Sequence, residues 1–139
     1  MTETRLSVRF AETDLMGIVH HSNYPVWFEM GRTDYFKTAG LSVGEIVKAG
    51  VQLPLTHLEC RFFYPALYDD VLIVRTRLSK LTCARMEFTY EVVKEDGGVL
   101  LATGASGHAW TDSGLKPINV IKRFPEIFGG LKALQSEEG

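Results

Sequence analysis

The residues best suited to chemistry gather in one polar run, residues 12–24. Within this run Asp14 offers a carboxylate, and Gly17 allows the backbone to turn sharply. A helix is predicted to begin just after Ser22, so the backbone amides near His21 and Ser22 lie at its N-terminus, where they are unpaired and attract negative charge. Such a carboxylate and such amides suffice for acyl transfer: one group attacks or activates water, and the other stabilises the oxyanion.

Other chemistries fit this run less well. An aspartate before a helix is commonly a turn or capping residue, which stays open for Asp14. A zinc site at His20 and His21 would need further converging ligands, and His57 and His108 offer no paired motif, so no metal is expected. The sequence also lacks the Gly-x-Ser-x-Gly elbow of a Ser-His-Asp hydrolase.

The elements that must position this run follow from hydrophobic periodicity. Apolar residues recur at helical spacing over 23–38, and Gly40 ends that long helix. Ser42 and Glu45 form a capping box for a short helix that ends at Gly50. Alternating or apolar runs bounded by turn signals predict strands at 5–10, 54–64, 71–80, 85–94 and 99–111.

Short connections make neighbouring strands antiparallel, and the helix is about as long as the strands, so the sheet is predicted to wrap around it. The small residues at 104–107 would leave room for the helix against the last strand. The tail from about residue 121 is predicted to form a short C-terminal helix that is interrupted at Gly129 and Gly130 and frays from Gln135 to Gly139.

Composition limits the class of protein. A chain of 139 residues fits one domain, 1–139, and leaves no room for a separate cofactor domain. With 45% hydrophobic residues, 23% charged residues and a net charge of −2, it is a globular chain with no pull toward nucleic acid. No apolar stretch is long enough to span a bilayer or to act as a secretion signal, and two cysteines fit a reducing compartment, so a cytoplasmic location without membrane attachment is expected.

Residues 14–24, continued by Trp27, Phe28, Glu29 and Arg32, resemble the signature of the 4-hydroxybenzoyl-CoA thioesterase family of hotdog-fold acyl-CoA thioesterases. Residues 68–72 also resemble that family's entry into its third strand. The resemblance covers roughly residues 5–120 and implies an α+β hotdog fold, in which an antiparallel sheet of about five strands wraps one long central helix.

The resemblance also assigns roles at the catalytic end. Asp14 matches the family's catalytic aspartate, which is a nucleophile or a general base for water. His21 matches the helix N-terminal position whose amide polarises the thioester carbonyl, and its imidazole could assist. Some relatives carry a tyrosine four residues before the aspartate, where this chain has Phe10 and no hydroxyl. Glu29 is an alternative carboxylate, although an ion pair with Arg32 is its plainer role.

Substrate contacts are assigned in the same way. Gly17, Tyr24, Trp27 and Glu29 are the expected substrate-binding residues, and Phe28 with residues 53–55 could line an acyl pocket, although apolar stripes on helices are usually core. Family members hold the CoA phosphates with basic residues across a subunit interface, and Lys80, Thr82 and Arg85 match this region, with Lys116 as a further candidate.

The resemblance therefore implies an enzyme that hydrolyses an aromatic or aliphatic acyl-CoA to free acid and CoA. No cofactor is expected, because coenzyme A is part of the substrate. The family forms homodimers that often pair into homotetramers, and an exposed sheet edge would invite such pairing. Two alternatives remain: a hydroxyacyl-thioester dehydratase of the same fold, and a non-catalytic acyl-CoA-binding protein.

Overall fold

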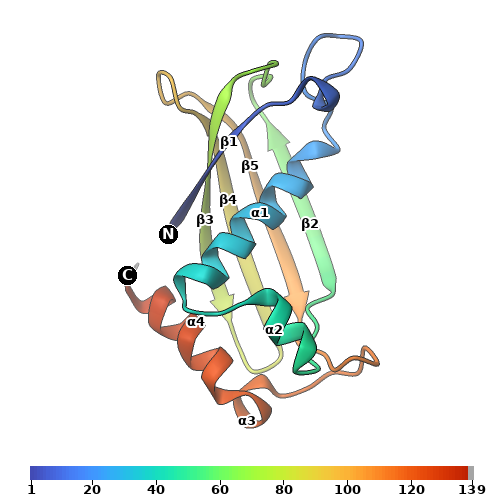
Figure 1. Cartoon of the computed structure of the whole chain (residues 1–139), viewed down its shortest axis with the longest axis vertical. Coiled ribbons are helices and arrows are strands. Elements are labelled where there is room, and N and C mark those ends of the chain that lie inside the picture. Colours follow the sequence, from blue (N-terminus) through green and yellow to red (C-terminus); the bar gives the residue numbers. More distant parts are fainter. Residues whose placement is uncertain (138–139) are drawn as a thin grey trace.

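The computed structural model describes residues 1–137 as a single antiparallel sheet curved around one long helix, α1 (Figure 1). The strand order across the sheet is β1-β3-β4-β5-β2, so β1 and β2 form its two edges. The strands are β1 (Thr2–Ser7), β2 (Leu55–Phe62), β3 (Val71–Leu81), β4 (Arg85–Lys94) and β5 (Leu100–Ala109). The helices are η1 (Phe10–Glu12), α1 (Asn23–Thr38), α2 (Val43–Lys48), α3 (Val120–Arg123) and α4 (Pro125–Glu137).

The first strand differs from its predicted range. β1 begins at Thr2 and ends at Ser7, and the chain then turns into the 3-10 helix η1, which leaves Phe10 76% exposed. The apolar alternation is real, since Val8 is buried, but it continues past the last β1–β3 pair at Ser7. The other strands lie within two residues of their predicted bounds.

Helix α1 has its predicted length, and only part of its apolar surface meets the sheet. The buried side chains are Tyr24, Trp27, Phe28, Tyr35 and Phe36, whereas Val26 and Met30 are 50% and 41% exposed. Periodicity finds a helix but does not decide which of two adjoining apolar stripes meets the sheet.

Two glycines let α1 lie close to the sheet. A Cβ at Gly31 would collide with the hydroxyl of Thr76 on β3, and a Cβ at Gly104 on β5 would collide with the Phe28 ring. Phe28 in turn stacks on Tyr90 of β4, with ring centroids 4.2 Å apart. Gly104 therefore serves helix packing, as predicted for the small residues of the last strand, whereas a Cβ at Gly107 would meet Thr56 and His57 of β2.

The C-terminal segment is more ordered than predicted. Helix α4 runs through Gly129 and Gly130, and Gln135 is helical and donates a hydrogen bond to the backbone oxygen of Leu78 on β3 (3.1 Å). Gln135 to Glu137 belong to the helix and residues 138 and 139 lie outside the described residues, so the fraying stays a prediction. The predicted interruption at Gly129 and Gly130 is wrong, because apolar side chains on one face of α4 are buried and outweigh the two glycines. These buried side chains are Ile127, Leu131 and Leu134. Within residues 1–137, no helix is long and apolar enough to cross a membrane.

Candidate active site

The loop between η1 and α1 holds Asp14 in a tight turn. The Asp14 amide donates to the backbone oxygen of Ile18 (2.9 Å), and the Gly17 amide donates to the backbone oxygen of Asp14 (2.9 Å). Gly17 has φ +79°, which glycine adopts without strain. The Met16 amide donates to Oδ1 of Asp14 (2.8 Å), so Oδ2 is the carboxylate oxygen without a partner in the described chain.

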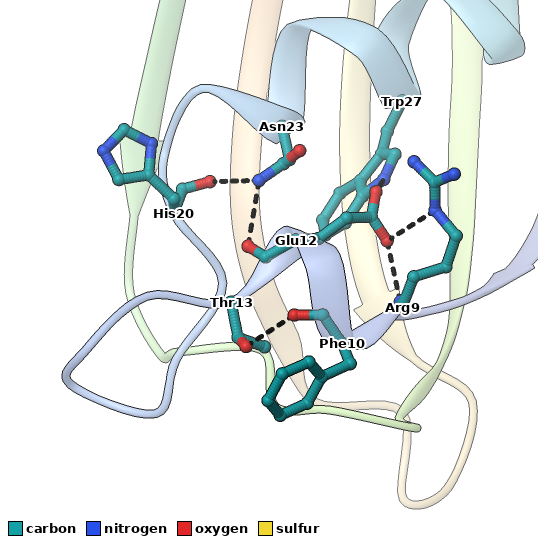
Figure 2. Close-up of polar contacts among 7 residues, drawn as sticks. All are labelled: Arg9, Phe10, Glu12, Thr13, His20, Asn23 and Trp27. Carbon is teal, nitrogen blue, oxygen red and sulfur yellow. Dashed lines mark hydrogen bonds and ion pairs between the residues drawn. The ribbon is translucent and has the colours of Figure 1, made fainter.

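A buried glutamate anchors this loop to the core (Figure 2). Glu12 is 4% exposed, and its carboxylate accepts from the Arg9 amide (2.8 Å) and from the indole N–H of Trp27 (2.9 Å). The Glu12 backbone oxygen accepts from the His20 amide and from the Asn23 side chain, so Glu12 ties both ends of the loop together. The sequence identifies Glu12 only as part of the polar run, because no local pattern pairs it with Trp27.

The start of α1 leaves one amide free. The Ser22 amide donates to Nδ1 of His20 (3.2 Å), and the Asn23 and Tyr24 amides donate to the backbone oxygens of His20 and His21. Among residues 1–137, the His21 amide has no hydrogen-bond partner. It is the unpaired donor at the position that the resemblance assigns to carbonyl polarisation.

Asp14 and His21 border one cavity of about 160 Å³. Its remaining walls are mostly apolar, and Tyr24 meets Phe62 of β2 there edge to face, with ring centroids 5.0 Å apart. An apolar cavity with a carboxylate and a free amide at its border can hold an acyl group and direct a nucleophile and a donor at its carbonyl. Within the described chain, no group of three or more His, Cys, Asp or Glu side chains converges as a metal site would.

Three predicted substrate-binding residues lie outside this cavity. Gly17 forms the turn, and Trp27 is 2% exposed in the core with its indole bound to Glu12. Glu29 is exposed on α1 and borders other cavities, and Arg32 donates to the Tyr90 hydroxyl (3.0 Å) instead of forming the expected ion pair with Glu29. Of the four residues, only Tyr24 borders the Asp14 cavity.

The predicted CoA-binding residues lie at the other end of the sheet. The Asp14 amide bonds to Ile18, which bridges Leu67 shortly before β3 begins, whereas Lys80, Thr82 and Arg85 surround the end of β3. Eleven residues of β3 span about 35 Å at 3.3 Å per residue. The Thr82 hydroxyl also accepts from the Ala84 and Arg85 amides and so shapes the turn. One chain does not bring these residues to Asp14, and their CoA contacts stay a prediction that requires a second subunit.

Comparison with known proteins defines the class. Residues 8–129 match the thioesterase-like superfamily, so the chain belongs to that family, and the sheet around α1 is its hotdog fold. The likeness supports the family as a whole rather than the 4-hydroxybenzoyl-CoA branch.

Individual relatives span nearly the whole chain. The chain is 32% identical over 127 residues to "Putative acyl-CoA thioesterase YneP" of Bacillus subtilis, covering 91% of each protein. A DHNA-CoA thioesterase from Staphylococcus aureus superposes with a TM-score of 0.90 at 32% identity, over 99% of this chain and 95% of that one. The hypothetical protein TT1821 of Thermus thermophilus superposes equally well, with a TM-score of 0.90 at 37% identity over 96% and 99% of the two chains.

Proposed function

We propose that Asp14 is the catalytic carboxylate of an acyl-CoA thioesterase and that the His21 amide binds the thioester oxygen. The protein is a thioester hydrolase that converts acyl-CoA to free acid and CoA, as its relatives' names describe. The observation that supports the catalytic assignment is that Asp14, whose Oδ2 has no partner in the described chain, and His21, whose amide has none, border the same mostly apolar cavity.

The proposed reaction needs only these groups and water. The thioester carbonyl oxygen accepts from the His21 amide, which stabilises the negative charge that develops there. Asp14 either attacks the carbonyl carbon to give a mixed anhydride that water then hydrolyses, or removes a proton from the attacking water. In both routes the C–S bond breaks and CoA leaves as the thiol, without a metal or redox cofactor.

Thiol release tests the assignment of Asp14. CoA released from aromatic, short-chain and long-chain acyl-CoAs is followed with a thiol-reactive dye for the wild type, Asp14→Asn and Asp96→Asn. Asp14→Asn should retain the fold and lose at least about a hundredfold in turnover, because a directly acting group is removed. Asp96 lies in the exposed turn between β4 and β5, so its variant is a matched control.

The outcomes separate the assignments. Wild-type turnover retained in Asp14→Asn would remove Asp14 from the mechanism. Intact binding without thiol release from any acyl-CoA would favour the dehydratase or the binding protein. Oxygen-18 from labelled solvent that appears in Asp14 after a single turnover would demonstrate direct attack, because the general-base route places the label only in the released acid.

A homodimer that pairs into a homotetramer is the proposed assembly. Supporting it, β2 lies at the sheet edge with exposed side chains along most of its length, including Leu55, Leu58 and Phe62. The neighbouring α1 exposes Val26 and Met30. Unpaired edges and exposed apolar side chains favour association, and light scattering on the purified protein checks the mass. The proposed location is the cytoplasm, which agrees with two free cysteines.

A further inference from the structure

A largely buried hydrogen-bond chain runs from α1 across β4 and β5 to the segment just before β2. Nη1 of Arg32 contacts the Tyr90 hydroxyl (3.0 Å), which contacts Oγ of Ser106 (2.5 Å). Oγ of Ser106 contacts Nε2 of His108 (2.9 Å), and Nδ1 of His108 contacts the backbone oxygen of Leu53 (3.3 Å). Tyr90, Ser106 and His108 are all less than 5% exposed, so water does not compete for the two bonds that join these three side chains.

The donors and acceptors of this hydrogen-bond chain can be arranged in only one way. The Leu53 oxygen only accepts, so Nδ1 of His108 carries the proton and donates. Burial lowers the pKa of His108 to about 4, so its imidazole is neutral and Nε2 accepts from Ser106. Ser106 must then accept from Tyr90, whose oxygen accepts from Arg32. Each bond orders the next, and together they fix the position of the guanidinium.

Ser106 and His108 do not form a second catalytic pair. Ser106 is 1% exposed and borders none of the cavities along α1, so no substrate carbonyl can reach it. Its role is to hold Tyr90 and, through Tyr90, Arg32.

Arg32 itself faces open space. It borders a cavity of about 190 Å³ with His108, whose other walls include Phe36, Leu53 and Met86. Within residues 1–137, its guanidinium makes a single hydrogen bond, to Tyr90, although it carries five N–H donors. A rigid donor with unused N–H groups beside apolar walls is the arrangement by which pockets orient ligands.

Glu29 defines which ligand fits. Its carboxylate borders the same cavity, lies more than 4.0 Å from the Arg32 nitrogens and has no hydrogen-bond partner in the described chain. The charges of Arg32 and Glu29 offset each other, so this cavity has no net positive charge to attract an anionic ligand. A hydroxyl suits both, because its oxygen accepts from Arg32 and its proton is donated to Glu29.

The cavity is the last of three that follow one another along α1 and β2. The first is the Asp14 cavity, bordered by Tyr24 and Phe62, and the next has about 180 Å³. Arg32 lies eight residues after Tyr24 on α1, or about 12 Å at 1.5 Å per residue, which a medium-length acyl chain can span. The middle cavity is bordered by Pro25, Glu29 and Arg32, and by Val26, Leu55 and Leu58, which also belong to the surface proposed to associate in the dimer.

We propose that Arg32 is a specificity-determining residue that binds a hydroxyl group on the distal part of a medium-length acyl chain, with Tyr90, Ser106 and His108 as its positioning residues. The inference rests on the proposed function for where the thioester lies. What it adds is that the enzyme prefers an acyl chain that carries a distal hydroxyl group to an unsubstituted acyl chain.

Matched substrates test this preference. The values of kcat/KM are compared for decanoyl-CoA, ω-hydroxydecanoyl-CoA and ω-carboxynonanoyl-CoA with the wild type, Arg32→Met and Arg77→Met. The wild type should prefer the hydroxylated chain over decanoyl-CoA by about tenfold or more, as a hydrogen bond to a charged donor provides. Arg32→Met should abolish the preference, whereas Arg77→Met should keep it, because Arg77 is exposed on β3.

Tyr90→Phe tests the positioning chain. It removes only the hydroxyl that holds Arg32, while the ring can still stack on Phe28. It should raise KM for the hydroxylated substrate more than it changes kcat and lower the preference several-fold. An unchanged preference for the hydroxylated substrate would show that the hydrogen-bond chain takes no part in substrate recognition.

Non-hydrolysable thioethers keep the two proposals separate. Binding of S-decyl-CoA and S-(ω-hydroxydecyl)-CoA is measured by calorimetry, which needs no turnover. Tighter binding of the hydroxylated thioether that is lost in Arg32→Met supports the subsite, even if no thioester is hydrolysed. Equal binding of both thioethers by the wild type, or a preference for the carboxylate-ended substrate, would overturn the inference.

Discussion

The buried Glu12 carboxylate provides the sharpest test of how the active-site loop is held. The change is Glu12→Gln, which keeps the shape and one acceptor oxygen but turns the other oxygen into a donor. Two donors aim at this carboxylate, the Arg9 amide at 2.8 Å and the Trp27 indole at 2.9 Å, so one of them must then face another N–H group.

The cost follows from these contacts. One hydrogen bond to a charged acceptor is lost and one buried donor is left without a partner, which together cost about 2–4 kcal/mol. The Arg9 ion pair at 3.5 Å adds little, because the Arg9 side chain is 74% exposed. For a chain of this length the loss lowers Tm by roughly 6–12 °C.

Chemical denaturation followed by tryptophan fluorescence measures the change in the free energy of unfolding. Glu87→Gln is the matched control, because Glu87 is exposed on β4, and it should stay within about 0.5 kcal/mol of the wild type. If Glu12→Gln behaved like this control, the reasoning that the carboxylate anchors the loop through buried hydrogen bonds would be refuted.

Two further predictions concern α4 and the buried imidazole. Gly129→Ala should raise the free energy of unfolding by about 0.5–1 kcal/mol, because its Cβ would meet nothing within 4 Å. Gly130→Ala should raise it less, since its Cβ would lie 3.2 Å from a backbone oxygen. Denaturant unfolding curves that rank the two variants in the opposite order would contradict this prediction. His108 has a pKa of about 4 in the folded protein against an ordinary 6.5, so between these pH values only the unfolded chain takes up the proton and stability falls as the pH is lowered. The difference in unfolding free energy between the wild type and His108→Gln should shrink by up to about 3 kcal/mol from pH 7 to pH 4, and a constant difference would show that His108 titrates normally.

Much of the fold could be predicted because its signals are local. The bounds of α1, α2 and β2 to β5 follow from periodicity, a capping serine and glycines such as Gly40, whose φ is +80°. Ser42 caps α2 as predicted, by accepting from the Glu45 amide (3.3 Å). The start of β1 and the continuous α4 were mispredicted, because pairing with β3 and burial of one helical face outweigh local preference in those segments.

The candidate site divides in the same way. The sequence by itself determined the loop of Asp14, Gly17 and His21, because neighbouring residues and one motif define it. Only the tertiary structure decided that Glu12 meets Trp27, that Arg32 turns from Glu29 to Tyr90, and that Lys80 and Arg85 lie at the far end of the sheet from Asp14. These contacts join residues from different elements, and no local pattern encodes the strand order or the side-chain packing that bring such residues together.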